Sequence, residues 1–383
     1  MPTSIISRND FLRGILATVI GIPGLSRLAQ AEDLRQLTKL ERPLKPVTIS
    51  SARIIRTVVG LRPYRKSGFV LKAERMGRKY VVHNYGHGGG GVSLSWGCAN
   101  LAAELASETS LVASTRLKHA AVIGAGVIGL STARILQDQG WIVTIYADKL
   151  TPNTTSNIAG AHWTPSSVYD TDFISSEFKD TFIKAANISY RTFQLLIGTN
   201  YGVRWLDNYD LSDSDSGDDM VSYTTRNGLR NCYPNIEWID PESTPFSAKR
   251  VQRYATMLIE PNTYLPALMR DFLLRGGNLV VRKFEHRSQW QQLHAPVIVN
   301  CTGLGARELL GDAELVPVRG QLTVLEPQPE IDYIVLHGGL YMFPRSDGIL
   351  LGGTWDEGDW SLEPNLESQA RILERHAKLY RLN

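Results

Sequence analysis

Uninterrupted apolar runs beside glycines dominate the centre of the chain. Residues 119–123 lead into the glycine turn of residues 124–129, and residues 141–146 form a second apolar run. Strands buried on both faces, as in a parallel sheet, give such runs. Residues 130–139 have helical character, and Gly140 is a natural helix stop. The pattern predicts strand, helix and strand in a protein of the α/β class.

A second glycine-rich turn lies upstream, at residues 86–91. A short strand is expected before it, at 80–82, and a helix of small residues after it, at about 93–106. The free N–H groups of a helix start, beside uncovered backbone, suit a planar anionic ligand edge. A flexible loop is the alternative. His83 and His87 have the spacing of a helical metal pair, but the glycines disfavour a helix there, so no metal site is predicted.

The turn of residues 124–129 reads G-x-G-x-x-G. Gly124 permits the tight turn, Gly126 lets backbone approach a pyrophosphate, and Gly129 lets helix and strand pack closely. Asp148 lies 19 residues after Gly129, where it can accept a hydrogen bond from a ribose hydroxyl. These features in register predict a dinucleotide site, with a glycine-rich turn of an unrelated α/β fold as the alternative.

Composition limits the class of protein. The chain has 383 residues, 43% of them hydrophobic, and a formal charge of +3, from 41 Lys and Arg against 38 Asp and Glu. These values exclude a largely disordered chain and a bundle of membrane helices, and they give no nucleic-acid footprint. The length allows two domains or one large one. Cys98, Cys232 and Cys301 are too sparse for a disulfide framework or zinc site, so each is expected to be buried.

The first 31 residues have the layout of an export signal. A basic start is followed by a short apolar stretch at 14–25, and residues 29–31 form a small-x-small cleavage site. Residues 7–13 look like a twin-arginine signal with Asn9 in place of the second arginine. A periplasmic or extracellular protein without a membrane span in its mature form is expected. A cytoplasmic protein, or one anchored by an uncleaved N-terminal segment, is the alternative.

Taken together, several segments resemble the D-amino acid oxidase family of FAD enzymes. They correspond to the dinucleotide turn, the threonine loop near the FAD phosphates, the T-G beside the flavin, the R-G-Q turn and strands of the substrate domain. In chain order they are residues 59–65, 83–98, 124–133, 146–157, 160–165, 297–303, 317–321 and 341–360.

The order of these segments departs from that of the family. G-L-R-P, at 60–63, and H-N-Y-G-H-G-G, at 83–89, normally come last but here precede residues 124–129. The resemblance therefore implies a circular permutation, with the old ends joined through about residues 107–118 and the new ends in the substrate domain. Residues 362–383 are expected to be helical.

The resemblance also implies two discontinuous domains. A Rossmann-type FAD-binding domain would collect residues 60–170 and 248–316. An α+β substrate domain with a large mixed sheet would collect residues 32–59, 171–247 and 317–383.

The activity implied by the resemblance is oxidation of a D-amino acid by molecular oxygen to a 2-oxo acid, ammonia and hydrogen peroxide. A hydride would pass from the α-carbon to flavin N5. Arg62 would hold the substrate carboxylate with its fork of donors, Tyr341 would donate a second hydrogen bond, and the Gly89 carbonyl would accept from the amine. His337 and Thr164 would contact the side chain. No general base is proposed, because alignment can carry the step.

The resemblance assigns FAD contacts mainly to glycines and small polar residues. The expected FAD-binding residues are Gly86, Gly88, Gly89, Gly90, Gly91, Val92, Ser93, Gly124, Gly126, Val127, Ile128, Gly129, Asp148, Lys149, Thr154, Thr155, Ser156, Gly160, Ala161, Trp163, Thr302 and Gly303.

Several alternatives stay open at this point. The enzyme could pass electrons to a quinone or carrier as a dehydrogenase, or prefer D-aspartate. A nicotinamide-dependent domain or a non-catalytic FAD binder are further possibilities. Residues 210–219, DLSDSDSGDD, lack the glutamate of a calcium loop and are expected to be a solvated loop. The oligomeric state is not predicted.

Overall fold

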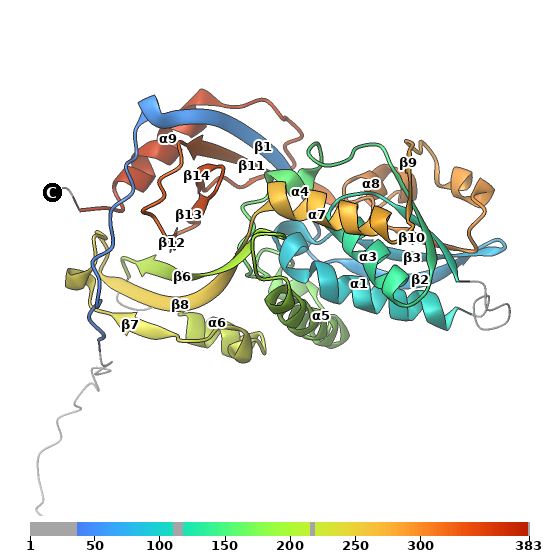
Figure 1. Cartoon of the computed structure of the whole chain (residues 1–383), viewed down its shortest axis with the longest axis horizontal. Coiled ribbons are helices and arrows are strands. Elements are labelled where there is room, and N and C mark those ends of the chain that lie inside the picture. The colour runs from blue at the N-terminus through green and yellow to red at the C-terminus, as the bar shows by residue number, and fades with distance from the viewer. Residues whose placement is uncertain (1–36, 110–117, 215–218, 382–383) are drawn as a thin grey trace, which may run out of the picture. The chain divides into compact units, whose positions relative to one another are not determined.

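A computed structural model describes residues 37–109, 118–214 and 219–381. Within these residues the chain forms a six-stranded sheet and a nine-stranded sheet, with helices against both (Figure 1). The expected export signal, residues 1–31, and most of the expected connector, residues 107–118, lie outside the described residues.

The six-stranded sheet is the dinucleotide-type sheet that the apolar runs predict. Neighbouring strands are parallel except at one edge, where β2 runs antiparallel to β3. In spatial order the strands are β2 (Val70–Met76), β3 (Lys79–Tyr85), β10 (Val297–Asn300), β4 (His119–Ile123), β5 (Ile142–Ala147) and β9 (Asn278–Val281).

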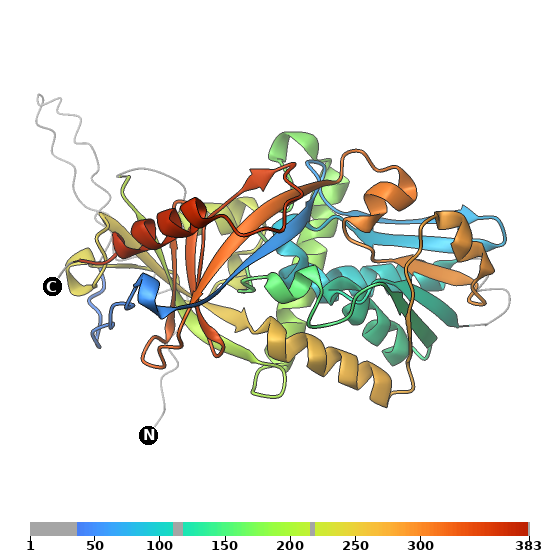
Figure 2. The ribbon, with the colours of Figure 1, turned by 90° about the horizontal axis from the view of Figure 1, so that it is seen from above.

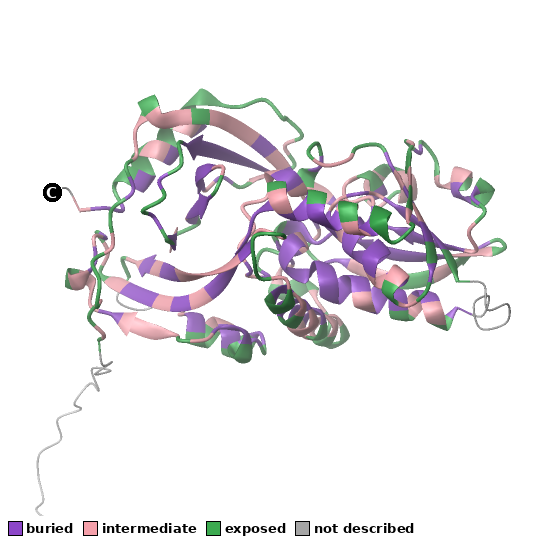
Figure 3. Ribbon diagram, viewed as in Figure 1, coloured by how far each residue is buried: buried purple, intermediate pink, exposed green. Residues whose placement is uncertain are grey.

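Alternate residues of β4 enter two separate cores. Ala120 and Val122 pack in the main core with α1 (Gly91–Glu108) and α3 (Val127–Asp138), whereas Ala121 and Ile123 pack on the other face with Trp290. Both faces of the sheet are therefore buried, as Figure 3 shows for its central strands. Burial on both faces is the physical reason why the strand sequence is apolar at every position.

The nine-stranded sheet is mostly antiparallel, with one parallel pair, β12 and β6. Its strands in spatial order are β1 (Ile54–Tyr64), β11 (Val316–Leu325), β14 (Gly348–Gly352), β13 (Leu340–Arg345), β12 (Tyr333–His337), β6 (Val203–Ser212), β8 (Arg250–Ile259) and β7 (Glu237–Ile239), and β15 (Asp356–Glu357) pairs with β11.

The two faces of this large sheet differ in what covers them. On one face, Ile372 of α9 (Leu366–Ala377) packs into a core with Leu351 and Met342. Figure 2 shows α9 running along this sheet. The opposite face holds a smaller apolar cluster, which includes Phe343 and Ile334. That second face contributes a wall of the cavity described below.

The remaining helices connect the sheets or pack beside them. They are α4 (Thr155–Ile158), α5 (Ser176–Leu195), α6 (Met220–Arg226), α7 (Pro261–Leu274) and α8 (Gly305–Leu310).

The expected domain boundaries need two corrections. Residues 60–64 and 250–259 were assigned to the FAD-binding domain, but they belong to β1 and β8 of the large sheet. β1 runs unbroken across the expected boundary at residue 60, and β8 pairs along its whole length with β6 of the large sheet. Residues 210–219 also differ from the expected solvated loop. Asp210 lies inside β6, paired with Gln252 of β8 and Leu336 of β12.

Candidate active site

One large cavity, of about 1660 Å³, is lined by residues of both sheets. The carboxyl ends of β3, β4 and β5 border it from the six-stranded sheet, and β1, β6, β12 and β13 border it from the large sheet. Ligands of open α/β sheets bind beyond the carboxyl ends of the strands. The cavity therefore lies where the glycine motif predicts a dinucleotide.

The three glycines of the turn between β4 and α3 have three different roles. Gly124 has φ +113°, and a Cβ there would lie 2.4 Å from the Cys301 carbonyl oxygen. A Cβ on Gly129 would lie 2.0 Å from the Gly124 carbonyl oxygen. A Cβ on Gly126 would meet only the Ser156 Oγ, at 3.2 Å, so this glycine keeps the turn open toward the cavity. These are the roles that the sequence predicts.

The threonine loop closes over the start of α3. The Val127 N–H donates to Ser156 Oγ over 3.0 Å. Thr154 caps the short helix α4, with its hydroxyl donating to Asn157 Oδ1 over 2.7 Å. Thr154, Thr155 and Ser156 all line the cavity. The loop therefore brings hydroxyl groups to the helix N-terminus, which favours bound phosphate.

Charged residues gather where β5 and β9 end. Asp148 and Lys149 follow β5, Arg282 and Lys283 follow β9, and all four line the cavity. Asp148 follows the second strand of the β4–α3–β5 unit, the position from which an acidic residue accepts a hydrogen bond from a ribose hydroxyl in dinucleotide folds. Together with the open backbone at Gly126, these groups fit a dinucleotide such as FAD.

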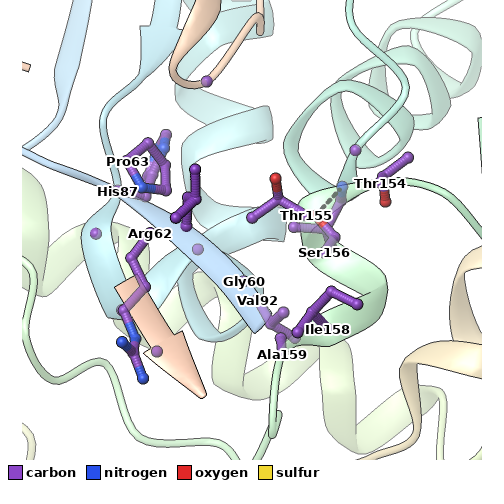
Figure 4. Close-up of a pocket in the computed structure, with 18 of the residues that line it drawn as sticks. Gly60, Arg62, Pro63, His87, Val92, Thr154, Thr155, Ser156, Ile158 and Ala159 are labelled. Carbon is purple, nitrogen blue, oxygen red and sulfur yellow. Dashed lines mark hydrogen bonds between the residues drawn. The ribbon is translucent and has the colours of Figure 1, made fainter. Parts of the chain in front are cut away.

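Arg62 and Tyr341 meet on the large-sheet side of the cavity. Arg62 Nη2 donates to Tyr341 Oη over 3.2 Å. Arg62 Nη1 is buried without a hydrogen-bond partner, and no described carboxylate lies within the 4.0 Å of an ion pair. Figure 4 shows the Arg62 side chain extending from β1, with the loop of Thr155 and Ser156 across the cavity. A partly buried cation with a free donor is ready to bind a ligand anion.

Two glycines of the large sheet make room for this pair. A Cβ on Gly320 of β11 would lie 2.4 Å from Arg62 Nη1, and a Cβ on Gly352 of β14 would lie 2.1 Å from the Tyr341 ring. The Arg62 guanidinium also lies 5.5 Å from the centre of the Trp355 ring. The position of the cation is therefore fixed by the surrounding strands.

Other arginines on neighbouring strands are fully engaged within the protein. Arg345 is paired with Asp347 and also donates to the Ala159 carbonyl oxygen. Arg319 is paired with Asp356 and donates to the Glu363 carbonyl oxygen. Arg62 differs because its partners leave one nitrogen for a ligand.

The expected pocket residues Thr164 and His337 line the cavity, and so does His162. The His162 ring packs against Phe343, with centroids 4.8 Å apart, and burial lowers the pKa of His162 to about 4. His162 is therefore neutral at pH 7. His337 pairs with the exposed Asp213 over 3.1 Å, and it ends β12 just before a two-glycine turn. This short connection between β12 and β13 leaves no room for a long lid.

Most of the glycine-rich segment after β3 also lines the cavity, including Gly86, Gly88 and Gly89. The Gly89 N–H donates to the Ser167 carbonyl oxygen over 2.8 Å. Ser167 has φ +55°, an uncommon conformation for serine. The contact fixes the turn that precedes α1.

Three expected cofactor residues do not line the cavity. The Trp163 side chain is fully buried and packs against Tyr190 and Tyr233. A Cβ on Gly90 would meet Val168, and Gly129 packs on the turn backbone. Trp163 is therefore a core residue and was wrongly assigned, because its neighbours in sequence do face the cavity. The other expected residues, from Gly86 to Gly303, line it.

Sequence reasoning missed Asp210, Tyr254 and Trp355, which line the same cavity. Asp210 was hidden in an acid-rich segment, and Tyr254 in an ordinary strand pattern. Alternation along β6 and β8 assigns Asp210 and Tyr254 each to one face of its own strand, but only the pairing of the two strands brings them together.

The three cysteines are buried and free, as expected. Burial raises the pKa of Cys232 to about 11 and that of Cys301 to about 12. Both thiols are therefore protonated at pH 7. Within the described parts of the chain, no helix has the length and apolar character needed to cross a membrane.

Comparison with known proteins identifies a family whose sequence profile matches this chain. The sequence profile of the FAD dependent oxidoreductase family matches residues 18–105 and 119–381. Human D-aspartate oxidase is 32% identical over 265 residues, 67% of this chain and 74% of that protein. D-amino-acid oxidase of Streptomyces coelicolor is 31% identical over 271 residues, 67% of this chain and 76% of that protein.

Among solved structures, glycine oxidase of Geobacillus kaustophilus has the same fold. Its TM-score is 0.53 at 19% identity, over 68% of this chain and 77% of that one. The profile match spans most of the chain, and the cavity fits the cofactor in its glycine turn, its threonine loop and its charged end. This chain therefore belongs to the family of FAD-dependent oxidoreductases.

Proposed function

We propose that this enzyme oxidises D-amino acids to 2-oxo acids, with FAD as cofactor and oxygen as electron acceptor. The observation that carries the proposal is the free guanidinium nitrogen of Arg62, beside the Tyr341 hydroxyl, in the cavity that also holds the dinucleotide turn. The names of the two oxidase relatives support the D-amino acid substrate and the use of oxygen.

The residues that would hold FAD are those of the β4–α3 turn, the threonine loop and the glycine segment before α1. The chemistry that bound FAD would supply is acceptance of the hydride from the α-carbon, with transfer of two electrons to oxygen to give hydrogen peroxide. The amino acid becomes an imino acid, which water converts to the 2-oxo acid and ammonia.

The protein's own part is to bind and align the substrate. Arg62 pairs with the α-carboxylate through Nη1, and the Tyr341 hydroxyl is within reach of the same group. His162 and Phe343 contribute an apolar, neutral wall that limits water near the reacting carbon. Fixing one end of the substrate in this way supplies the proximity that the reaction needs.

The test uses the full chain carrying FAD, without oxygen. Matched D- and L-amino acids are added in turn, and the visible flavin absorption is followed. D-forms are expected to bleach the flavin, and admission of air is expected to restore it with release of hydrogen peroxide. Reduction by L-forms instead, or by neither form, would contradict the proposal. Slow reoxidation in air with fast reoxidation by a quinone would point to a dehydrogenase.

We also propose that the chain order arose by circular permutation. Three observations support this. The profile match is interrupted at 106–118, where the expected connector lies. The early strand β3 pairs with the late strand β10, and β2 pairs with the outer side of β3. The described ends are close neighbours, because Thr38 pairs with Ile239 and Tyr380 with Phe246. Export through residues 1–31 stays a proposal from sequence, and N-terminal sequencing of the mature protein tests it.

A further inference from the structure

Four strands place a row of side chains along the cavity wall. Tyr341 of β13 pairs with Leu336 of β12, Leu336 pairs with Asp210 of β6, and Asp210 pairs with Gln252 of β8. Directly paired residues project from the same face of a sheet. Tyr341, Leu336 and Asp210 accordingly all line the cavity.

The spacing of this row determines the distance between the carboxylate-binding end and Asp210. Neighbouring strands lie about 4.8 Å apart, so the backbones at Tyr341 and Asp210 are separated by roughly 10 Å. Tyr341 and Arg62 mark the end that would hold the α-carboxylate. Asp210 then lies where the far end of a long substrate side chain would reach, with the apolar Leu336 between them.

Asp210 has no partner of its own. Among the described residues, none forms an ion pair or hydrogen bond with its carboxylate. Burial raises the pKa of Asp210 to about 6, so the group is mostly ionised at neutral pH. An ionised carboxylate that is partly buried and unpaired is unfavourable unless a cation joins it.

Other polar groups beside Asp210 are also unsatisfied. Tyr254 Oη and Gln252 Nε2 are buried without a hydrogen-bond partner, and so are both amide atoms of Asn208. All three lie on the same face of β6 and β8 as Asp210, because they pair with it or lie two residues away. This end of the wall therefore offers a group of polar atoms as well as a charge.

We propose that the preferred substrates are D-amino acids with a long cationic side chain, such as D-lysine and D-arginine, whose terminal cation pairs with Asp210. This inference rests on the proposed function, since it takes the α-carboxylate to be held by Arg62. Leu336 contacts the methylene groups of the side chain, and Tyr254, which lines the cavity from β8, offers a neutral polar group at the same end.

The same arrangement disfavours acidic side chains. A carboxylate at the far end would face Asp210 and find no cation there. The cavity-lining cations of the described chain other than Arg62 are Lys149, Arg282 and Lys283, which follow β5 and β9 of the other sheet. D-aspartate and D-glutamate are therefore poor substrates, despite the similarity to human D-aspartate oxidase.

The first experiment compares two substrates that differ mainly in charge. kcat/KM is measured at pH 8 for D-lysine and for D-norleucine, which has a similar length and no charge, with D-alanine as the short reference. We expect D-lysine to exceed D-norleucine by roughly ten- to a hundredfold, the range for a hydrogen bond to a charged group. A value for D-norleucine equal to or above that for D-lysine overturns the inference.

The second experiment changes the carboxylate. Asp210→Asn is expected to abolish the preference for D-lysine while kcat/KM for D-alanine stays within about threefold, because a short side chain does not reach Asp210. Asp213→Asn is the matched control, an exposed acid just after the same strand, and it is expected to keep the preference. An unchanged preference in Asp210→Asn overturns the inference.

A binding measurement gives a readout apart from turnover. 6-aminohexanoate and hexanoate are titrated into the oxidised enzyme, and their binding is followed by the change in the flavin spectrum. The wild type is expected to bind 6-aminohexanoate more tightly, and Asp210→Asn is expected to bind both equally. Equal binding by the wild type contradicts the inference. If no D-amino acid, D-alanine included, reduces the flavin, the proposed function fails and this inference fails with it.

Discussion

The two ends of the cavity are built in different ways. At the dinucleotide end, the cavity wall consists mainly of backbone and small side chains from short sequence segments, as at Gly126 and Ser156. At the substrate end, single side chains from separate strands meet, as Arg62 of β1 meets Tyr341 of β13. Ligand binding at the dinucleotide end depends on the absence of side chains, whereas ligand binding at the substrate end depends on particular side chains.

This difference explains how the two ends respond to change. A glycine whose Cβ would meet backbone, such as Gly129 against the Gly124 carbonyl oxygen, tolerates no substitution, because those backbone atoms cannot move aside. A side chain on a wide strand can be replaced without loss of the fold, so specificity can change at that end. The comparison predicts that mutations at the dinucleotide end affect the folded state or the binding of FAD, and that mutations at the substrate end affect the reaction.

The largest effect on the reaction is expected from Arg62→Ala. Loss of the cation leaves the substrate carboxylate unpaired, which costs about 4 kcal/mol of transition-state binding free energy. We therefore expect kcat/KM to fall roughly a thousandfold. The melting temperature should change little. Arg56→Ala is the control, since Arg56 lies on the same strand and pairs with Asp347. Near-normal kinetics in Arg62→Ala would contradict the assignment of Arg62 as the residue that binds the substrate carboxylate.

The largest effect on the fold is expected from Gly129→Ala. Its Cβ would lie 2.0 Å from a backbone oxygen, and overpacking of this kind costs about 3 kcal/mol or more. Gly126→Ala has room beside Ser156 and is expected to keep the fold but bind FAD more weakly. Thermal unfolding and the flavin content of purified protein measure the two effects. Equal behaviour of the two variants would contradict the roles assigned to these glycines.

Tyr341→Phe is expected to have a smaller effect. It removes one hydrogen bond to the substrate carboxylate and keeps the stacking on Phe343, where the ring centroids are 5.1 Å apart. A decrease in kcat/KM of about tenfold, from roughly 1.4 kcal/mol, is expected. Kinetics with D-alanine measure it. A decrease in kcat/KM as large as that in Arg62→Ala would mean that the Tyr341 hydroxyl does more than bind the substrate carboxylate.

The preference for cationic side chains is expected to depend on pH. Asp210 is protonated as the pH falls through about 6, so the ratio of kcat/KM for D-lysine to that for D-norleucine should decrease there. Tyr254 and Gln252, which face Asp210 from β8, do not titrate in this range, because burial raises the Tyr254 pKa well above its usual value. His337 pairs with Asp213, and Asp213→Asn controls for it. A ratio independent of pH would contradict a role for Asp210.

The same pKa has a consequence for stability. Because burial raises the folded-state pKa of Asp210 above its ordinary 3.8, ionisation of Asp210 destabilises the folded chain as the pH rises from about 4 to 6. Asp210→Asn should therefore raise the melting temperature at pH 8 and leave it nearly unchanged at pH 4. An equal or lower melting temperature at pH 8 would show that the carboxylate is stabilised in the free enzyme.

The smallest effect is expected from restoring the family order of segments. A chain that begins at residue 119, continues to 381 and is linked to residues 37–109 should fold, bind FAD and turn over D-alanine as the natural chain does. The expectation follows from the closeness of the two described ends on residues 238–247. An insoluble or colourless product would contradict a permuted ancestry. Absorption and thermal unfolding measure the outcome.

The sequence predicted the dinucleotide half well and the substrate half in part. The β4–α3–β5 unit could be predicted because both faces of its strands are buried and its three glycines fall within residues 124–129. Arg62 and Tyr341 were found only through the family resemblance. Asp210 was missed because its position depends on pairing between β6, β8 and β12, which sequence periodicity does not encode. Trp163 shows the opposite error, in which a sequence neighbour of cavity residues points into the core.

The pairing of β1 with β11 has a consequence for biosynthesis. Ile54 pairs with Leu325, so β1 leaves the ribosome roughly 270 residues before the strand that it joins. At usual rates of translation this is on the order of 10 to 50 s. The strand that carries Arg62 therefore lacks its partner strand β11, and has an unpaired edge, during most of the time needed for translation. The nascent chain is expected to need protection by chaperones until its last third emerges.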